Sequence, residues 1–231
     1  MQKAIILLSG GLDSTTVSAI AKNKNYELYG LSFDYGQRHK SELEVAKKTA
    51  KKFGFKEHKI IKSGVGQLGG SALTTDIAVP KNKKIEDIGK EIPITYVPAR
   101  NVIFLSYALG YAETINCFDI FIGVNSVDFS GYPDCTPEFI KAFENMANIS
   151  ASIVKKTGNK IKIHSPLEKM TKKEIIQAGI NLGVDYAETI TCYDYDPNLG
   201  ACGTCESCKL RLNGFKEAGI KDPAKYRIEI Y

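Results

Sequence analysis

The stretch AIILLSGGLDSTT, residues 4–16, decides the fold. Residues 4–8 form a short apolar run, which is typical of a buried strand in a parallel sheet. A serine and two glycines follow at once, and residues 14–24 then carry apolar side chains at helical spacing. The stretch therefore predicts a strand, a tight turn and a helix in direct succession.

The turn in this stretch has the properties of a phosphate-binding loop. Its two glycines lack a Cβ, so backbone N–H groups can approach a ligand closely. The following helix directs its N-terminal amides and the positive end of its dipole to the same place. A plain turn with a helix cap is the alternative. We expect the phosphates of a nucleotide to bind along Leu8, Ser9, Gly10, Gly11, Leu12, Asp13, Ser14, Thr15 and Thr16.

Asp13 is an unusual residue beside an anion, and a Mg²⁺ ion shared with phosphate oxygens accounts for it best. The loop is not a Walker A loop, because GxxxxGK[ST] does not occur in the sequence.

Strands and helices alternate along the rest of the chain. Four more apolar segments are expected as strands, at residues 27–33, 57–61, 119–122 and 161–164. Helices are expected at residues 41–53, 101–114, 137–156 and 171–182. This order predicts an α/β fold, a Rossmann-like parallel sheet with helices on both faces. Ligands of such sheets bind at the carboxyl ends of the strands, where the strand order reverses.

Helix starts are predicted from capping patterns. Ser41 with Glu44 and Thr171 with Glu174 match the capping box. Thr136 is expected to cap the helix that begins with proline at position 137.

Two regions differ from this alternation. Residues 62–96 are rich in glycine and lysine with weak periodicity, which predicts an inserted or mobile loop. Within it, GVGQLG (64–69) matches GxGxxG, but no helix is expected at its last glycine, which favours a loop over a NAD site. We expect residues 1–183 to form the nucleotide-binding catalytic domain and residues 184–231 a small C-terminal appendage.

The appendage contains four cysteines spaced C-x9-C-x2-C-x2-C: Cys192, Cys202, Cys205 and Cys208. Four thiolates in one compact loop suit tetrahedral Zn²⁺, although an iron–sulfur cluster also takes four. We favour one zinc ion per chain. Four cysteine ligands leave no open position for catalysis, so the predicted role of the metal is structural.

The composition is that of an ordinary globular protein, with 231 residues, 43% of them hydrophobic and 25% charged. A net charge of +5 is compatible with anionic small molecules and too small to indicate nucleic acid. No signal peptide and no apolar run long enough for a membrane span are visible. We expect a cytoplasmic protein with reduced thiols and no membrane partner.

Two further loops carry unusual polar residues. VPARN (97–101) precedes an expected helix, and GVNSVDFSGYPDC (123–135) follows an expected strand. The second offers carboxylates, hydroxyls and two aromatic rings, which suit a flat polar heterocycle. Each segment alone is more often an ordinary turn.

Together these segments resemble a known family. SGGLDS (9–14) is similar to the signature of PP-loop ATP pyrophosphatases, which cleave ATP between its α- and β-phosphates. With FDYGQRH (33–39), VPARN, DFSGYPDC (128–135), ETITCY (188–193) and CGTCESC (202–208), the chain resembles the 7-cyano-7-deazaguanine synthase family over almost its whole length. It departs from that pattern at Thr136, where arginine is expected, and at Ala99, where glycine is commoner.

The resemblance implies an adenine nucleotide alpha-hydrolase-like fold and an ATP-dependent ligase. Such enzymes convert 7-carboxy-7-deazaguanine and ammonia to 7-cyano-7-deazaguanine through an adenylated intermediate, for queuosine or archaeosine biosynthesis. The implied cofactors are ATP, Mg²⁺ and Zn²⁺, the partners are small molecules rather than nucleic acid, and a homodimer is expected.

The same resemblance supplies candidate site residues. Asp13, nearest the metal ion, and Arg100, holding a phosphate or the substrate carboxylate, are the catalytic candidates. The predicted substrate contacts are Asp128, Ser130, Tyr132 and Asp134. His39 is either a base or a solvated loop residue, Cys135 is expected to be buried rather than nucleophilic, and His164 stays unassigned.

Two alternative functions remain at this point. The first is a PP-loop enzyme that modifies tRNA by thiolation or lysidine formation, although no RNA-binding domain is visible in the sequence. The second is a zinc-ribbon binding module with a vestigial nucleotide site, which would bind nucleic acid in a salt-sensitive way.

Overall fold

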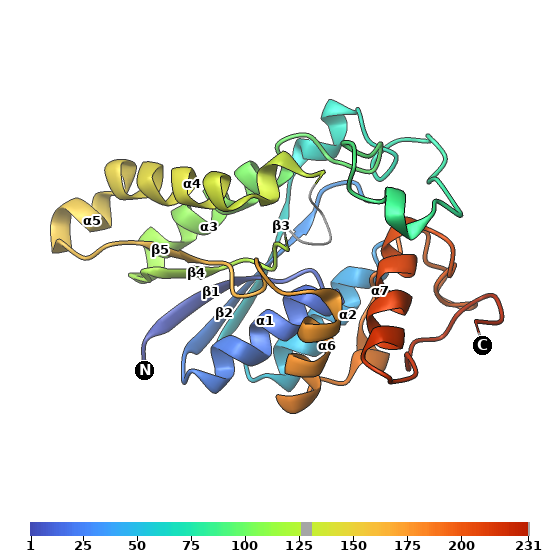
Figure 1. Cartoon of the computed structure of the whole chain (residues 1–231). Coiled ribbons are helices and arrows are strands. Elements are labelled where there is room, and N and C mark those ends of the chain that lie inside the picture. The colour runs from blue at the N-terminus through green and yellow to red at the C-terminus, as the bar shows by residue number, and fades with distance from the viewer. Residues whose placement is uncertain (126–130, 231) are drawn as a thin grey trace.

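The structure, a computed structural model, describes residues 1–125 and 131–230 (Figure 1). Within these ranges, parallel strands form one sheet in the order β3-β2-β1-β4-β5. The strands are β1 (Lys3–Leu7), β2 (Glu27–Asp34), β3 (Glu57–Lys62), β4 (Asp119–Phe121) and β5 (Lys162–His164).

Helices cover both faces of the sheet, as the sequence predicts. In Figure 1, α3 (Arg100–Ile115) and α4 (Pro137–Ser150) lie on one face, with the short α5 (Ser152–Thr157) beyond them. The other face carries α1 (Leu12–Asn23), α2 (Ser41–Lys52) and α6 (Lys172–Asn181), and α7 (Glu206–Glu217) packs beside α6. Short 3₁₀ turns are η1 (Gly64–Leu68), η2 (Ile85–Asp87), η3 (Pro133–Cys135) and η4 (Tyr186–Glu188).

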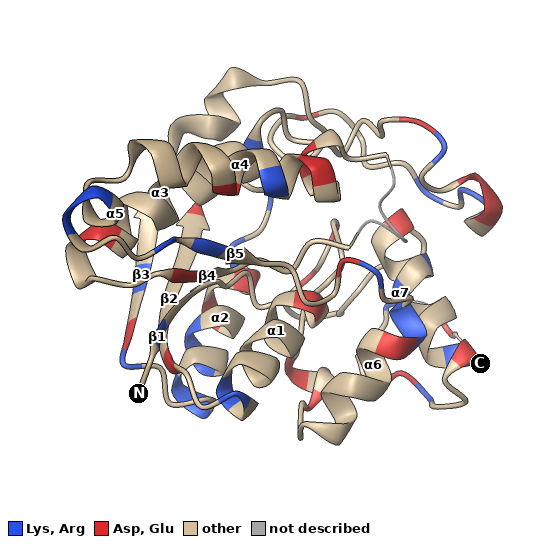
Figure 2. Ribbon diagram, turned by 60° about the vertical axis from the view of Figure 1, so that its left-hand side comes forward, with Lys and Arg blue, Asp and Glu red and all other residues tan. Residues whose placement is uncertain are grey.

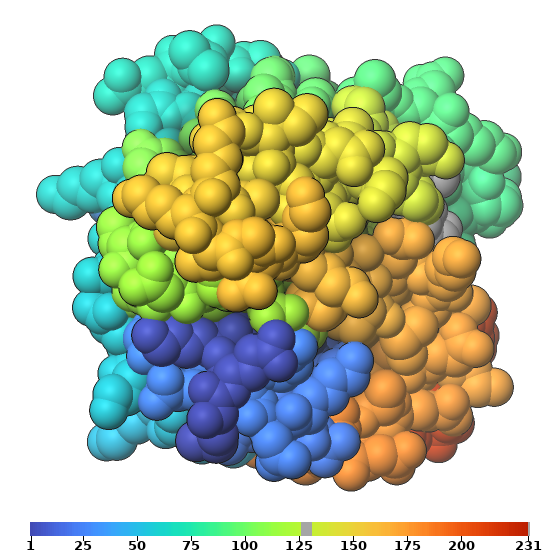
Figure 3. Space-filling view, turned by 90° about the vertical axis from the view of Figure 1, so that its left-hand side faces the viewer, coloured from blue at the N-terminus to red at the C-terminus, as the bar shows by residue number. Residues whose placement is uncertain are grey.

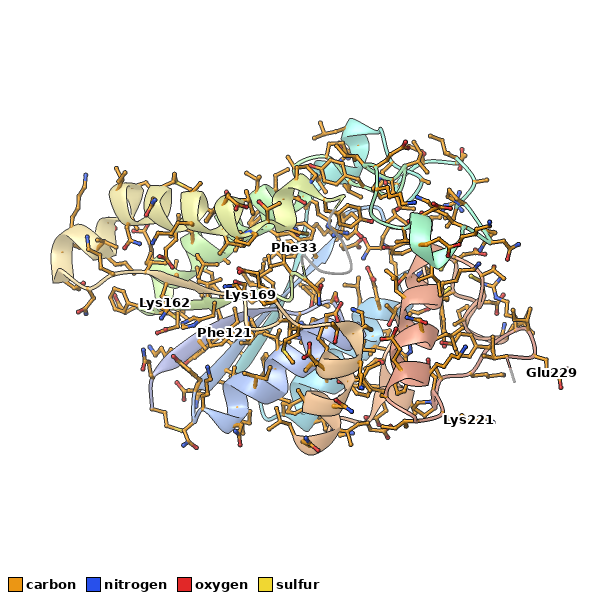
Figure 4. All side chains as sticks on the ribbon, viewed as in Figure 1. Phe33, Phe121, Lys162, Lys169, Lys221 and Glu229 are labelled. Carbon is orange, nitrogen blue, oxygen red and sulfur yellow. The ribbon has the colours of Figure 1, made fainter. Side chains whose placement is uncertain are left out.

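The apolar run of β1 is explained by its central place in the sheet. Ile5 belongs to the buried cluster on the α3 and α4 face, and Ile6 to the cluster on the α1 and α6 face. Both are fully buried, and each such side chain contributes about 1.5–3 kcal/mol to folding. Phe33 and Phe121 likewise lie on opposite faces (Figure 4), where Phe33 stacks on Phe104 of α3 with ring centroids 3.8 Å apart.

Figure 3 shows that the N-terminal segment and the segment around α6 meet on one face of the molecule, in agreement with the contacts between α1 and α6. Charged residues of both signs are spread over the ribbon rather than gathered on one face of it (Figure 2), as the small net charge suggests. Among the described residues, no helix is long and apolar enough to cross a membrane.

Some predicted helix limits differ from the structure. The prediction of a capping box at Ser41 is wrong, because Ser41 is already helical. Lys40 takes the N-cap position and makes no capping hydrogen bond with its side chain. The box of Thr171 and Glu174 is confirmed, as is the cap at Thr136, whose hydroxyl accepts from the Phe139 amide. The helix predicted at 137–156 is two helices, because the extended backbone of Ala151 separates α4 from α5.

Residues 62–96 contain short 3₁₀ turns and pack against the C-terminal segment. Lys81 pairs with Asp194 at 2.7 Å and Lys83 with Glu206 at 3.0 Å. The GxGxxG match forms η1, and no helix opens at its last glycine. The prediction that no helix begins at this glycine is therefore confirmed.

A buried ion pair holds the C-terminal segment, residues 184–231, together. Arg211 of α7 binds Asp222 at 2.8 and 2.9 Å and also donates to the carbonyl of Tyr186. Both charged side chains are almost fully buried, and further hydrogen bonds satisfy the guanidinium, which such a pair requires. The ring of Tyr186 packs in turn against Phe215 of α7.

Gly10 should tolerate no side chain. Its φ is +80°, and an added Cβ would lie 2.6 Å from the carbonyl oxygen of Glu42 and 2.8 Å from the amide of Ala46. We predict that Gly10→Ala lowers the free energy of unfolding by roughly 2–5 kcal/mol in urea denaturation. Gly54→Ala is the matched control: φ is +68°, but the nearest atom is a lysine Nζ at 3.8 Å, so the expected loss is about 1 kcal/mol. Equal losses would contradict close packing of the loop on α2.

Candidate active site

A cavity of about 260 Å³ lies at the carboxyl ends of β1, β2 and β4. After β1, the chain adds β2 and β3 on one side of β1 and then β4 and β5 on its other side. The cavity therefore lies at the point where the strand order reverses. The walls come from the loops after β1, β2 and β4, the start of α3, and residues 190–193 of the C-terminal segment. The sequence predicted a site at this edge of the sheet.

The loop after β1 forms one wall of the cavity. The hydroxyls of Ser9 and Ser14 lie 3.0 Å apart, and the Gly11 amide donates to the Ser9 hydroxyl at 3.2 Å. Gly123, after β4, closes against the loop, since an added Cβ would lie 3.3 Å from the Ser14 amide. Exposed amides and hydroxyls at a helix N-terminus can bind a phosphate chain.

The predicted phosphate-binding residues divide into two groups. Those that line the cavity are Leu8, Ser9, Gly11, Leu12, Asp13 and Ser14. Gly10 packs against α2 instead, and the Thr16 hydroxyl bonds to the Leu12 carbonyl and the Tyr186 hydroxyl. The Thr15 hydroxyl is buried and has no hydrogen-bond partner among residues 1–125 and 131–230. For all nine residues, contact with a nucleotide stays a prediction.

Asp13 has a partner that the sequence did not indicate. Its carboxylate accepts two hydrogen bonds from Lys172 at the start of α6, at 2.8 and 3.1 Å. Lys172 is 5% exposed, so the pair lies in a partly desolvated place beside the loop. It puts a cation within reach of the wall where phosphates would bind.

Arg100 lines the cavity from the first turn of α3. Burial acts to lower its pKa, but the nearby phenols of Tyr35 and Tyr132 outweigh this and the pKa lies above its usual value. The guanidinium therefore stays charged. The preceding Ala99 has a φ of +55°, a left-handed conformation that favours glycine, and alanine in this region costs about 1 kcal/mol.

Glu42 and Tyr35 face Arg100 and were not singled out from the sequence. Glu42 lies in the first turn of α2, where burial raises the pKa of its carboxyl to about 7 against the opposing effect of Arg100. Burial also raises the pKa of Tyr35 to about 12, so that phenol stays protonated. Both residues line the cavity.

Asp134 is placed as a helix cap. It is buried, does not line the cavity, and its carboxylate accepts from the Asn101 amide at 2.9 Å, in the first turn of α3. Tyr132 lines the cavity, with its hydroxyl 3.2 Å from that of Thr95. Asp128 and Ser130 lie outside the described residues, so the predicted substrate contacts remain predictions.

Burial limits the reactions in which Cys135 and His39 can take part. Burial raises the pKa of the Cys135 thiol to about 12, so it is not a nucleophile at neutral pH. His39 lines the cavity, and its Nε2 donates to the Cys192 carbonyl at 3.0 Å. Burial lowers the pKa of His39, so the ring is neutral. His164 binds Asp119 at 2.7 Å and is not part of the cavity wall.

The four predicted metal ligands meet in one place. The sulfurs of Cys192, Cys202, Cys205 and Cys208 all lie within 4.8 Å of one another, and all four residues are buried. Backbone amides of Asp194 and Cys202 donate to the Cys192 sulfur at 3.3 and 3.2 Å, as expected around a thiolate ligand. The cluster can hold a metal ion, and Cys192 also lines the cavity.

Residues 3–219 match the family model described as "Queuosine biosynthesis protein QueC". This chain belongs to the QueC family. A QueC relative from Citrifermentans bemidjiense, named 7-cyano-7-deazaguanine synthase, is 59% identical over 226 residues, covering 98% of both chains. One of the same name from Desulfatibacillum aliphaticivorans is 57% identical, covering 97% of both.

A solved structure shares the QueC fold. "The crystal structure of predicted subunit of tRNA methyltransferase" from Methanocaldococcus jannaschii matches with a TM-score of 0.51 and 19% identity, covering 99% of this chain and 93% of the other. At this identity the likeness concerns the fold alone.

The QueC chain offers a test of the role of Asp134. We predict that Asp134→Ala lowers the free energy of unfolding by about 1–2 kcal/mol, because α3 loses an acceptor at its N-terminus. Asp134→Asn keeps an acceptor oxygen and should retain most of the stability in the same urea titration. If both variants unfold like the unmodified protein, Asp134 does not cap α3.

Proposed function

We propose that this chain is an ATP-dependent ligase that converts 7-carboxy-7-deazaguanine and ammonia to 7-cyano-7-deazaguanine through an adenylated intermediate. The observation that carries the proposal is the identity of 59% over 98% of the chain to a relative named for this product. The geometry agrees, because a phosphate-binding loop, an arginine and a carboxyl group face one cavity.

The cavity residues suit the activation of a carboxylate. A carboxylate is a poor electrophile, and attack of its oxygen on the α-phosphate of ATP yields an acyl-adenylate with a good leaving group. The amides and hydroxyls of Ser9, Gly11 and Ser14 would hold the departing pyrophosphate, and Lys172 would add positive charge. Arg100 would neutralise the substrate carboxylate or the α-phosphate.

Asp13 is the carboxylate of this loop, and a Mg²⁺ shared with ATP would take the place of its contact with Lys172. Mg²⁺ would supply charge neutralisation on the phosphate oxygens.

Ammonia then displaces AMP to give the amide. A second adenylation, on the amide oxygen, followed by elimination of AMP, gives the nitrile. No enzyme nucleophile is needed, which agrees with the protonated thiol of Cys135.

The product would supply queuosine or archaeosine biosynthesis. We expect the enzyme to act on small molecules, without nucleic acid and as a homodimer.

The test is an ATP turnover assay with Mg²⁺, ammonium and 7-carboxy-7-deazaguanine, analysed by mass spectrometry. We expect the nitrile together with AMP and pyrophosphate formed only when the substrate is present. AMP formed only in the presence of tRNA would favour a tRNA-modifying enzyme, and no turnover with any substrate would favour a binding module.

Two serines of α1 provide a matched pair for this assay. Ser14→Ala removes a hydroxyl from the cavity wall and should lower kcat/KM for ATP roughly 10- to 100-fold, the effect of a hydrogen bond to a charged phosphate. Ser18→Ala is one turn further along, where the hydroxyl bonds to the Ser14 carbonyl away from the cavity, and should leave kcat/KM nearly unchanged. Equal effects would argue against phosphate binding by the loop.

We further propose that the cysteine cluster holds one structural Zn²⁺. Metal analysis should give about one zinc per chain. Cys205→Ser should lose the metal and lower the melting temperature by roughly 10 °C or more, because bound zinc contributes directly to folding. Cys117→Ser, a buried cysteine outside the cluster, should retain the zinc. Iron with visible absorbance would indicate an iron–sulfur cluster instead.

A further inference from the structure

Glu42 is a carboxyl group in the cavity wall to which the reaction outlined above assigns no part. It lies in the first turn of α2 and lines the cavity beside the phosphate-binding loop. Its own carbonyl oxygen is in the position that excludes a side chain at Gly10, so this turn of α2 is packed directly on the loop. The side chain therefore starts from backbone that is fixed relative to the phosphate-binding wall.

Gln37 is a fixed polar neighbour of the Glu42 carboxyl. The amide oxygen of Gln37 accepts from the Tyr35 amide at 2.8 Å, and its nitrogen donates to the Phe33 carbonyl at 3.1 Å. These two hydrogen bonds identify the oxygen and the nitrogen of the Gln37 side-chain amide. The Gln37 side chain lies near the Glu42 carboxyl and acts to lower its pKa.

The charged neighbours of Glu42 are few and mostly engaged elsewhere. Arg100 of α3 and the phenol of Tyr35 face it across the cavity. Of the other titratable groups in the wall, Arg38 donates to the Ile77 carbonyl at 2.9 Å, and Asp13 is paired with Lys172. His39 is bonded to the Cys192 carbonyl. Within the described parts of the chain, Glu42 makes no ion pair closer than 4 Å.

We propose that Glu42 is a catalytic residue that binds ammonia next to the activated carbon and accepts the protons that nitrogen loses. The inference rests on the proposed function. Arg100 would hold the anionic end of the adenylate, and Glu42, facing Arg100 across the same cavity, offers the acceptor that an incoming N–H donor needs.

The proton balance is as follows. The ammonia lone pair forms the C–N bond, the C–O bond to AMP breaks with its electron pair, and one N–H proton passes to the Glu42 carboxylate. After the amide oxygen is adenylated, the nitrogen loses its two remaining protons while the C–O bond breaks and the nitrile forms. Glu42 accepts these protons one at a time and returns each to solvent. The two carboxylate oxygens leave in two molecules of AMP, one pyrophosphate is released at each adenylation, and no oxidant or reductant is needed.

The acidity of the group supports this role. With the pKa of Glu42 raised to about 7, roughly half of the carboxyl is ionised at neutral pH, and it is a stronger base than an ordinary glutamate. Tyr35, with a pKa of about 12, and Cys135, also about 12, are protonated at that pH and cannot accept a proton.

The test separates the two halves of the reaction. Substrate-dependent exchange of pyrophosphate into ATP, measured without ammonia, reports adenylation alone, and mass spectrometry reports amide and nitrile. Glu42→Gln should leave exchange within about 3-fold of the unmodified enzyme and lower amide and nitrile formation roughly 10²- to 10⁴-fold, the usual contribution of a general base. Glu44→Gln, exposed on the same helix and paired with Lys47, should change neither.

The pH dependence gives a readout that a structural role would not move. Ionised Glu42 is the active form, so kcat/KM, expressed per unprotonated ammonia, should rise with pH up to about 7 and then level off. In Glu42→Gln, this rise of kcat/KM with pH should be absent. Glu42→Asp keeps a carboxylate on a shorter side chain and should recover part of the amide rate, whether or not Glu42→Gln folds well.

Three outcomes would overturn the inference. Equal losses of exchange and amide formation in Glu42→Gln would make Glu42 a support for the loop. Unchanged amide formation would exclude a role in proton transfer. Absence of substrate-dependent exchange in the unmodified enzyme would instead contradict the proposed function itself, and the inference with it.

Discussion

Close backbone packing around the turn after β1 is the constraint on which the rest of the site depends. Gly10 lies against the first turn of α2, and its carbonyl accepts from the Ile190 amide. Gly123 closes on the same turn from the loop after β4. Three segments far apart in the sequence are thus fixed to one short loop. This explains how a carboxyl on α2 and an aspartate in the loop share one rigid wall.

Local patterns predicted the fold because each of them encodes a local structure. Apolar runs gave the strands, and β1 is apolar on both sides because helices cover both faces of the sheet. The cysteine spacing predicted the cluster in which four sulfurs lie close together. The Ser41 capping box failed because the helix begins one residue earlier than that pattern requires, with Lys40 as its cap. Such one-residue shifts depend on packing that a sequence pattern does not contain.

The site was predictable only where it coincides with a motif. The loop residues were found because glycines and hydroxyls cluster between a strand and a helix. Lys172 was missed because it is 159 residues from Asp13 and stands in an ordinary helix start. Glu42 resembles any exposed glutamate of a first turn until the fold partly buries it in the cavity wall. Asp134 was expected to face a ligand. In the structure its carboxylate accepts a hydrogen bond from the Asn101 amide at the start of α3.

The segment that carries the four-cysteine cluster is also a wall of the cavity, which has a consequence for when the site is completed. The phosphate-binding loop is among the first parts of the chain to be synthesised, and residues 190–193 and the cysteines are among the last. A nascent chain can form most of the sheet early, yet the cavity closes only after the cysteine segment has folded. Folding of the segment with Cys192, which belongs to both the cysteine cluster and the cavity wall, would therefore be the step that completes the site.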